Sequence, residues 1–176
     1  MPLRSKAPLA LLVALGVLVS GAAPAAADTL LRLNGIGPLR LGMSRSAALA
    51  TGWLTHRTSG CPLGGPPLPV VYRVAGRRAP RGLSGTAEFD GGKLRVLSFT
   101  RGVHTRVGVT VGRTTVGAMV HRYRAAGFRA SAQYIATFQG TFVTIRRTAR
   151  GPQLLGAFAS GNVVQTLAVP DVPVCE

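Results

Sequence analysis

The pattern of apolar and polar positions predicts two helical segments, each followed by strands. From Thr115 to Ala126, apolar residues recur at spacings of three and four, which is typical of a helix with one buried face. A shorter helix is expected from Arg45 to Thr51. Ser44 and Thr114 stand just before these segments and are expected to cap them, because a side-chain hydroxyl can accept a hydrogen bond from an unpaired backbone N–H.

Runs rich in β-branched residues predict the strands that follow each helix. After the first helix they are Val70 to Val74, Thr86 to Phe89 and Lys93 to Phe99. After the second they are Thr141 to Ile145, Leu155 to Ala159 and Val163 to Val169, with room for an extra strand at Gln133 to Phe138. The last two strands of each set are joined by Asp90-Gly91-Gly92 or Ser160-Gly161-Asn162, residues that suit tight hairpin turns.

An internal duplication is predicted from three matching blocks. Residues 39–44 match 109–114 and residues 87–97 match 157–167, both at an offset of 112 − 42 = 70. Residues 77–82 match 146–151 at an offset of 69. The sequence therefore predicts an α+β fold of two homologous repeats, residues 28–104 and 105–176, each a helix packed on a three- to four-stranded antiparallel sheet.

The first 27 residues have the pattern of a cleaved export signal. Arg4 and Lys6 precede an apolar stretch from Ala7 to Val19, and the small residues Ala25-Ala26-Ala27 suit a cleavage site. A membrane-spanning helix needs roughly 20 apolar residues, more than this stretch provides. We therefore expect a secreted or cell-wall-associated protein that begins at Asp28.

Basic residues far outnumber acidic ones. The 176 residues contain 21 Lys+Arg and 5 Asp+Glu, a formal net charge of +16. So few carboxylates argue against glycosidases, aspartic proteases and carboxylate-ligated metal sites, which need paired acids. A surplus of this size favours anionic neighbours, although a bias in composition would produce arginines without any anionic ligand.

Cysteine, histidine and arginine supply the remaining candidate groups. Cys61 and Cys175 are expected to form a disulfide, since an exported chain with two cysteines most simply pairs them. The three histidines lack the close spacing of metal ligands, so no metal or other cofactor is expected. One candidate site comes from the two matching arginine loops, which are proposed to bind anions: Arg77, Arg78 and Arg81, and Arg146, Arg147 and Arg150. The other arginines, among them Arg124 and Arg129, are treated as ordinary exposed side chains.

The phrase Gly37-Pro38-Leu39-Arg40-Leu41-Gly42-Met43-Ser44, leading into an Ala-rich helix, resembles the opening of small secreted proteins of actinobacteria. The doubled layout resembles the tandem fold of the β-lactamase inhibitory proteins and of the outer-membrane lipoproteins SmpA and OmlA. This resemblance implies a non-enzymatic binding or scaffolding role. It carries over no functional residue, because those inhibitors bind through a concave aromatic surface and this chain has one Trp and three Tyr.

The leading functional expectation is thus an exported, non-catalytic binding protein, inhibitor-like or scaffolding, whose partner the sequence does not identify. The first alternative is an envelope protein that binds an anionic polymer or lipid through its arginine loops. The second is a secreted hydrolase, for which no Gly-x-Ser-x-Gly turn or other catalytic motif is found.

Overall fold

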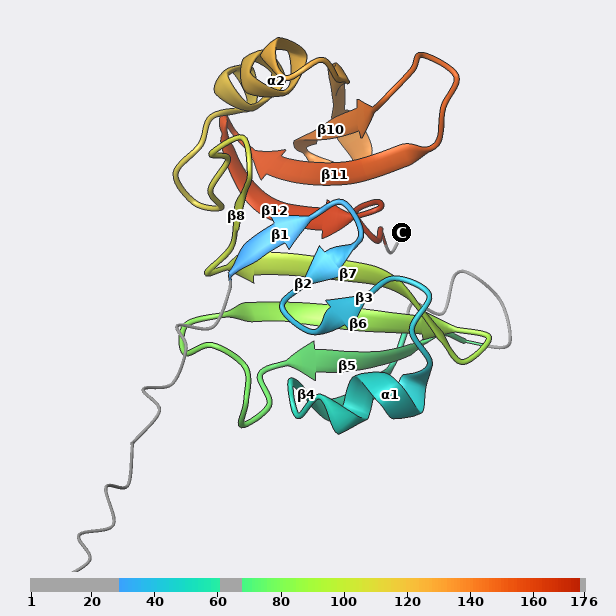
Figure 1. The fold of residues 1–176 in the computed structure, drawn as a ribbon. Coiled ribbons are helices and arrows are strands. Elements are labelled where there is room, and N and C mark those ends of the chain that lie inside the picture. The colour runs from blue at the N-terminus through green and yellow to red at the C-terminus, as the bar shows by residue number, and fades with distance from the viewer. Residues whose placement is uncertain (1–28, 61–67, 175–176) are drawn as a thin grey trace, which may run out of the picture.

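The computed structural model describes residues 29–60 and 68–174, which form two β-sheets and two α-helices (Figure 1). The first half contains β1 (Leu30–Arg32), β2 (Gly35–Ile36), β3 (Leu39–Arg40), α1 (Arg45–Ala50), β4 (Leu54–Ser59), β5 (Val70–Val74), β6 (Ser84–Asp90) and β7 (Lys93–Arg101). The second contains β8 (His104–Thr105), α2 (Val116–Ala125), β9 (Arg129–Ile135), the 3-10 turn η2 (Ala136–Phe138), β10 (Gly140–Arg146), β11 (Gln153–Ser160) and β12 (Val163–Val169).

The larger sheet has eight strands in the order β4-β5-β6-β7-β12-β11-β10-β9. Its centre is the antiparallel pair β7 and β12, in which Phe99 lies opposite Leu167 and Leu97 opposite Val169. All four side chains are completely buried. The last strand of each half therefore pairs with the last strand of the other, and one continuous sheet crosses both halves.

The smaller sheet, β3-β2-β1-β8, covers the middle of the large one, and the two helices lie towards its two sides (Figure 1). Leu31, Ile36 and Leu39 of the small sheet are buried in the same cluster as the central strands of the large sheet. From α2, Met119 and Tyr123 are buried, so these two residues form the apolar face that the sequence predicts. One hydrophobic core thus lies between the large sheet and the elements that cover it.

The turn before each helix is held against the last hairpin of its own half. The Gly42 N–H donates to Leu94 O at 2.8 Å, and the Gly112 N–H donates to Val164 O at 2.8 Å. Leu94 and Val164 are the residues that the offset of 70 pairs. The matching blocks thus occupy equivalent places, although descent of the two halves from one ancestor stays a prediction.

The predicted α+β class is wrong. The chain is mostly β, 14% helical and 49% strand, with two sheets of four and eight strands and two helices among the described residues. The two halves do not form separate helix-on-sheet units, because leaving β7 and β12 unpaired would expose two apolar strand edges in the middle of the molecule. Instead the edges join, and the short strands β1 to β3 cover the junction.

The individual elements agree more closely with expectation. The predicted strands are present as β5 to β7 and β10 to β12, but β1 to β4 and β8 were not expected. The extra strand predicted at Gln133 to Phe138 is present as β9, which runs from Arg129 to Ile135, while residues 136–138 form the 3-10 turn η2. Ser44 caps α1 as predicted. The cap of α2 is Thr115, whose hydroxyl accepts from the Ala118 N–H, whereas the Thr114 hydroxyl accepts from the Thr110 N–H at 2.8 Å.

Several expectations fall outside the described residues. These are the export signal over 1–27 and the pairing of Cys61 with Cys175, which both stay predictions. Within residues 29–60 and 68–174, no helix has the length and apolar character needed to cross a membrane.

Candidate anion-binding site

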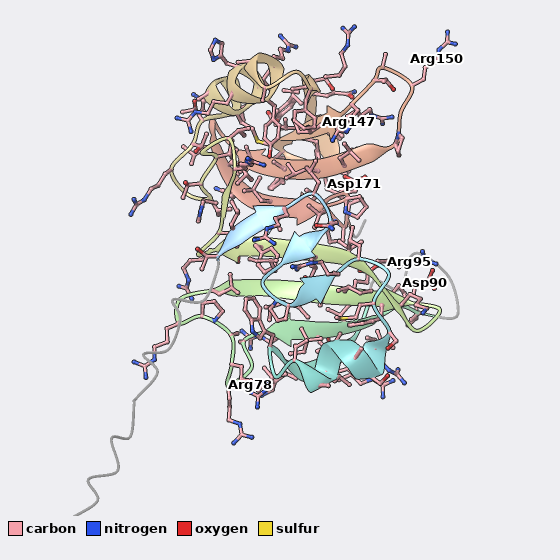
Figure 2. The ribbon with its side chains drawn as sticks, viewed as in Figure 1. Arg78, Asp90, Arg95, Arg147, Arg150 and Asp171 are labelled. Atoms are coloured by element: carbon pink, nitrogen blue, oxygen red, sulfur yellow. The ribbon has the colours of Figure 1, made fainter. Side chains whose placement is uncertain are left out.

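The two predicted arginine loops lie at opposite ends of the large sheet (Figure 2). The loop between β5 and β6 lies beside the C-terminal end of β7, since Ser84 pairs with Arg101. The loop between β10 and β11 lies at the other end, beyond Gly156, which pairs with Ala168. A single site that contains all six arginines is therefore not formed.

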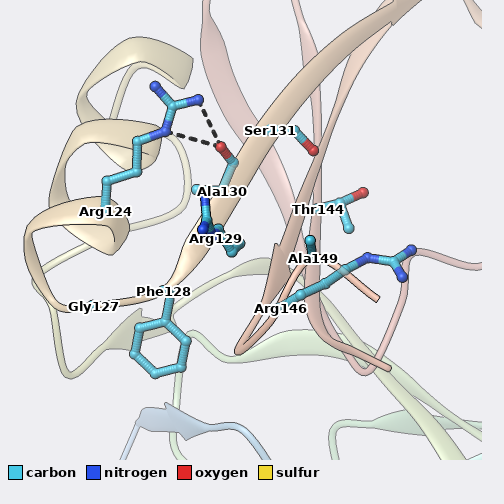
Figure 3. A pocket seen from close by; sticks show the side chains of 9 residues that line it. All are labelled: Arg124, Gly127, Phe128, Arg129, Ala130, Ser131, Thr144, Arg146 and Ala149. Atoms are coloured by element: carbon cyan, nitrogen blue, oxygen red, sulfur yellow. Dashed lines mark hydrogen bonds between the residues drawn. The ribbon is translucent and has the colours of Figure 1, made fainter. Parts of the chain in front are cut away.

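The second loop contributes to a hollow at the edge of the sheet, which we call the arginine hollow (Figure 3). It has a volume of about 590 Å³ and lies where the end of α2, the start of β9 and the end of β10 meet. Its lining residues are Arg124, Gly127, Phe128, Arg129, Ala130, Ser131, Thr144, Arg146 and Ala149. Three guanidinium groups and two hydroxyls, with no carboxylate, make this lining suited to an oxyanion.

Two of these arginines face each other across neighbouring strands. Arg129 of β9 lies directly opposite Arg146 of β10, and residues directly opposite each other share one face of a sheet. Like charges in this arrangement are destabilising. An anion between them would replace the repulsion with two charge-assisted hydrogen bonds.

Backbone contacts hold two of the guanidinium groups in place. Arg124 donates to Ala130 O from Nε at 3.0 Å and from Nη2 at 2.8 Å, so it anchors the end of α2 to β9. Arg146 donates from Nη1 to Gly151 O at 2.9 Å, which orders its own loop. In Figure 3 the Arg124 head lies against the Ala130 carbonyl, and the Arg146 side chain extends from β10 beyond β9.

Phe128 lines both the arginine hollow and a larger groove. The Arg147 guanidinium carbon lies 5.6 Å from the centre of the Phe128 ring, within cation–π range. The larger groove has a volume of about 840 Å³ and lies between β1, β8 and α2, where it is lined largely by apolar side chains such as Leu33 and Val107. Arg150 is exposed and points outward from the loop (Figure 2).

The first arginine loop has a smaller counterpart of the hollow. Arg77 and Arg78 line a space of about 390 Å³ beside the end of α1, whereas Arg81 is exposed outside it. No arginine of β4 faces them across the strands, because Thr55 pairs with Arg73 and Arg57 pairs with Tyr72. The cross-strand arginine pair belongs to the second half alone among the described strands.

The stretch of chain that forms the arginine hollow is strongly basic. Residues 91–170 contain ten arginines and one lysine but no Asp or Glu. The carboxylates on the described part of the chain are Glu88 and Asp90 on the first half and Asp171 after β12. The Asp171 Oδ1 accepts from Gln153 Nε2 at 2.5 Å and from its neighbouring Val172 N–H at 2.7 Å. Gln153 pairs with Arg146 across β10 and β11, but Asp171 itself is not one of the residues that line the hollow.

Two groups elsewhere have shifted pKa values. Glu88 lies on β6 opposite Val71 and Val96, and burial, with a smaller contribution from the charge of Asp90, raises the pKa of its carboxyl. Burial also raises the pKa of the Tyr123 phenol, and a hydrogen bond with Thr105 opposes this shift. Neither group lies in the arginine hollow.

Sequence reasoning identified Arg146 but missed Arg124 and Arg129, which it counted among ordinary exposed arginines. The pairing of Arg129 with Arg146 depends on the register of the β9–β10 hairpin, and that register follows from a β9 that begins four residues before the predicted strand. Ser131 and Thr144 carried no signal of their own. They join the hollow because each lies two residues along its strand from an arginine of the pair.

Two arrangements typical of chemical sites are absent from the described residues and from the arginine hollow. No three His, Cys, Asp or Glu side chains within 29–60 and 68–174 come together in a way that would hold a metal ion. In the arginine hollow, no imidazole, thiol or carboxylate among the lining residues stands beside Ser131 or Thr144 to activate the hydroxyl.

Known protein families, known proteins and solved structures yield no match to this chain, so its resemblance to the β-lactamase inhibitory proteins and the related lipoproteins stays a prediction.

Proposed function

We propose that this chain is a non-catalytic binding protein that holds an anionic macromolecule at the arginine hollow. The observation that carries the proposal is the pair Arg129 and Arg146, which face each other across β9 and β10 with Arg124 on a third side. No carboxylate lines the hollow. An arrangement that costs free energy in the absence of an anion is the arrangement that gains most from binding one.

Binding through an aromatic surface, as the resemblance implies for the inhibitors, has less support. Trp53, Tyr72 and Tyr123 are 5%, 9% and 3% exposed and belong to the core. Tyr134 alone of the tryptophan and tyrosines is freely exposed, at 63%. The arginines therefore supply more accessible binding groups than the aromatic side chains do.

The test is a titration with fluorescently labelled inorganic polyphosphate over a range of salt concentrations. Arg129→Gln combined with Arg146→Gln is expected to weaken binding. It should also reduce the slope of log K against log salt by about 1.4, because each neutralised phosphate of a single-stranded polyanion contributes roughly 0.7 to that slope. Circular dichroism and the melting temperature verify that the variant is folded.

The matched control is Arg77→Gln combined with Arg78→Gln. These two arginines line the smaller hollow at the opposite end of the sheet, so their loss lowers the net charge equally. The control should retain nearly the whole salt slope. Equal losses in both double variants would attribute binding to diffuse net charge and would exclude a site at the arginine hollow.

We further propose that the protein acts outside the cytoplasm, as the pattern of residues 1–27 indicates. The intact mass of protein recovered from the medium or the cell wall is expected to correspond to a chain that begins at Asp28. Recovery of a chain that retains Met1 would contradict the proposed export and cleavage.

A further inference from the structure

Strand β9 forms one edge of the large sheet. It is the last strand in the order, so no described element pairs with its outer side. Its seven residues pair with β10 in unbroken register from Arg129 to Ile135. After Arg129 it contains no charged residue, no proline and no glycine, so it lacks the features that usually prevent an edge strand from pairing.

The opposite edge of the same sheet has such features. In β4 the register shifts between Thr55 and Arg57, and His56 between them has φ 46°. This bulge interrupts the row of backbone groups, and Arg57 adds a charge to the edge. One edge of the sheet is thus interrupted and charged along its length, while the other is regular and carries no charge after Arg129.

The contact of Arg124 shows which backbone groups of β9 point outward. The Ala130 carbonyl accepts from Arg124 of α2, which places it on the outer side of β9. Backbone groups of an antiparallel pair alternate between facing the partner strand and facing away, so the N–H and C=O groups of Ala132 and Tyr134 also face outward. The outer side of β9 therefore presents a short row of donors and acceptors that begins at the arginine hollow. Ala132 is exposed, and so is Tyr134, the aromatic residue type that interfaces favour.

We propose that β9 binds an extended acidic segment of a protein partner as an added antiparallel or parallel strand. Main-chain hydrogen bonds to Ala132 and Tyr134 would hold the segment, and its carboxylates would lie at Arg124, Arg129 and Arg146. This inference rests on the proposed function and names the ligand as a polypeptide. A second copy of the chain is a poorer occupant, because pairing two β9 strands would bring two uniformly basic surfaces together.

The experiment compares a peptide with a polyanion that has no peptide backbone. The probes are a short peptide in which Glu alternates with Thr, and inorganic polyphosphate. Ala132→Pro removes one outward N–H and leaves the ladder with β10 intact, as edge prolines do. The matched control, Ala132→Ser, retains that N–H.

Ala132→Pro is expected to weaken peptide binding about tenfold, because an unpaired peptide carbonyl is costly to bury, while polyphosphate binding stays within about twofold. Ala132→Ser should change neither. A second measurement does not depend on the folding of any variant: methylating alternate backbone nitrogens of the peptide should weaken its binding to the unmodified protein by a similar factor.

Peptide binding that is unchanged by both Ala132→Pro and backbone methylation would overturn the added strand. In that case, a salt slope that still depends on Arg129 and Arg146 would leave the proposed function standing. If instead neither probe responds to loss of these arginines, the proposed function fails as well. Self-association that Ala132→Pro abolishes, without peptide binding, would show that the edge serves a second copy and would likewise overturn the inference.

Discussion

Removing the charge of Arg129 is expected to stabilise the protein in the absence of any anion. Arg129 lies opposite Arg146 in the sheet, and no hydrogen bond or ion pair of its guanidinium group is found within the described part of the chain. Cross-strand side-chain pairs contribute roughly 0.2–1 kcal/mol each, and like charges directly opposite each other are destabilising. Arg129→Gln should therefore raise the free energy of unfolding by an amount in that range.

Arg146→Gln should stabilise less, because it also removes the hydrogen bond to Gly151 O. A net hydrogen bond contributes about 0.5–1.5 kcal/mol, which offsets the relief of repulsion. The double variant should gain little over Arg129→Gln, since the repulsion can be relieved only once.

The assay is urea denaturation at about 0.01 M and about 1 M salt, where the screening length falls from about 30 to 3 Å. Arg57→Gln on the other edge strand is the control for net charge, since Arg57 pairs with Tyr72 and has no arginine opposite. Arg129→Gln should raise the free energy of unfolding more than this control does at low salt, and the difference between the two variants should vanish at high salt. A loss of stability at low salt, or a gain equal to that of the control, would refute the cross-strand repulsion.

Three further predictions concern the fold. Leu167→Ala leaves a cavity against Phe99 and should lower the free energy of unfolding by about 2–5 kcal/mol. Far-ultraviolet circular dichroism and tryptophan fluorescence should report the same single unfolding transition, and two separate transitions would contradict one continuous sheet. Burial raises the pKa of Glu88 above its ordinary 4.5, so the stability that its protonated carboxyl contributes is fully present below pH 4.5 and is lost as pH rises through the raised pKa. Glu88→Gln should therefore raise the melting temperature at pH 7 and change it little at pH 4, whereas equal effects at both pH values would contradict the raised pKa. Reduction of the predicted Cys61–Cys175 bond should lower the melting temperature of the whole protein, since closing so long a loop contributes about 4–5 kcal/mol to stability. Two thiols that label freely in the folded protein before reduction would disprove the pairing.

The strands with clear apolar alternation were predictable from sequence, and β4 was not. In β4 only Leu54 is buried, while His56 to Ser59 are all exposed, so no period-two pattern exists to be seen. The two-residue strands β2 and β3 were read as an approach to the first helix for a similar reason. Their pairing is set by Leu31, Ile36 and Leu39, which are buried against the large sheet.

The joining of the two halves was the main feature that sequence could not give. Val163 to Val169 and Lys93 to Phe99 read equally well as the final strands of two separate sheets. Which edges pair depends on long-range packing, because both alternatives satisfy the same local pattern. The arginine hollow was missed for the same cause: Arg129 and Arg146 are 17 residues apart, from 146 − 129, and meet only through the hairpin register.

The most direct test of the arginine hollow follows the Nε–H signals of the arginines by NMR as inorganic polyphosphate is added. The signals of Arg129 and Arg146 should shift first and saturate together, while those of Arg77 and Arg78, at the opposite end of the sheet, should remain in place until much higher concentrations. Shifts of equal size and equal midpoint for all four arginines would contradict a built anion site and would leave only a uniformly basic surface.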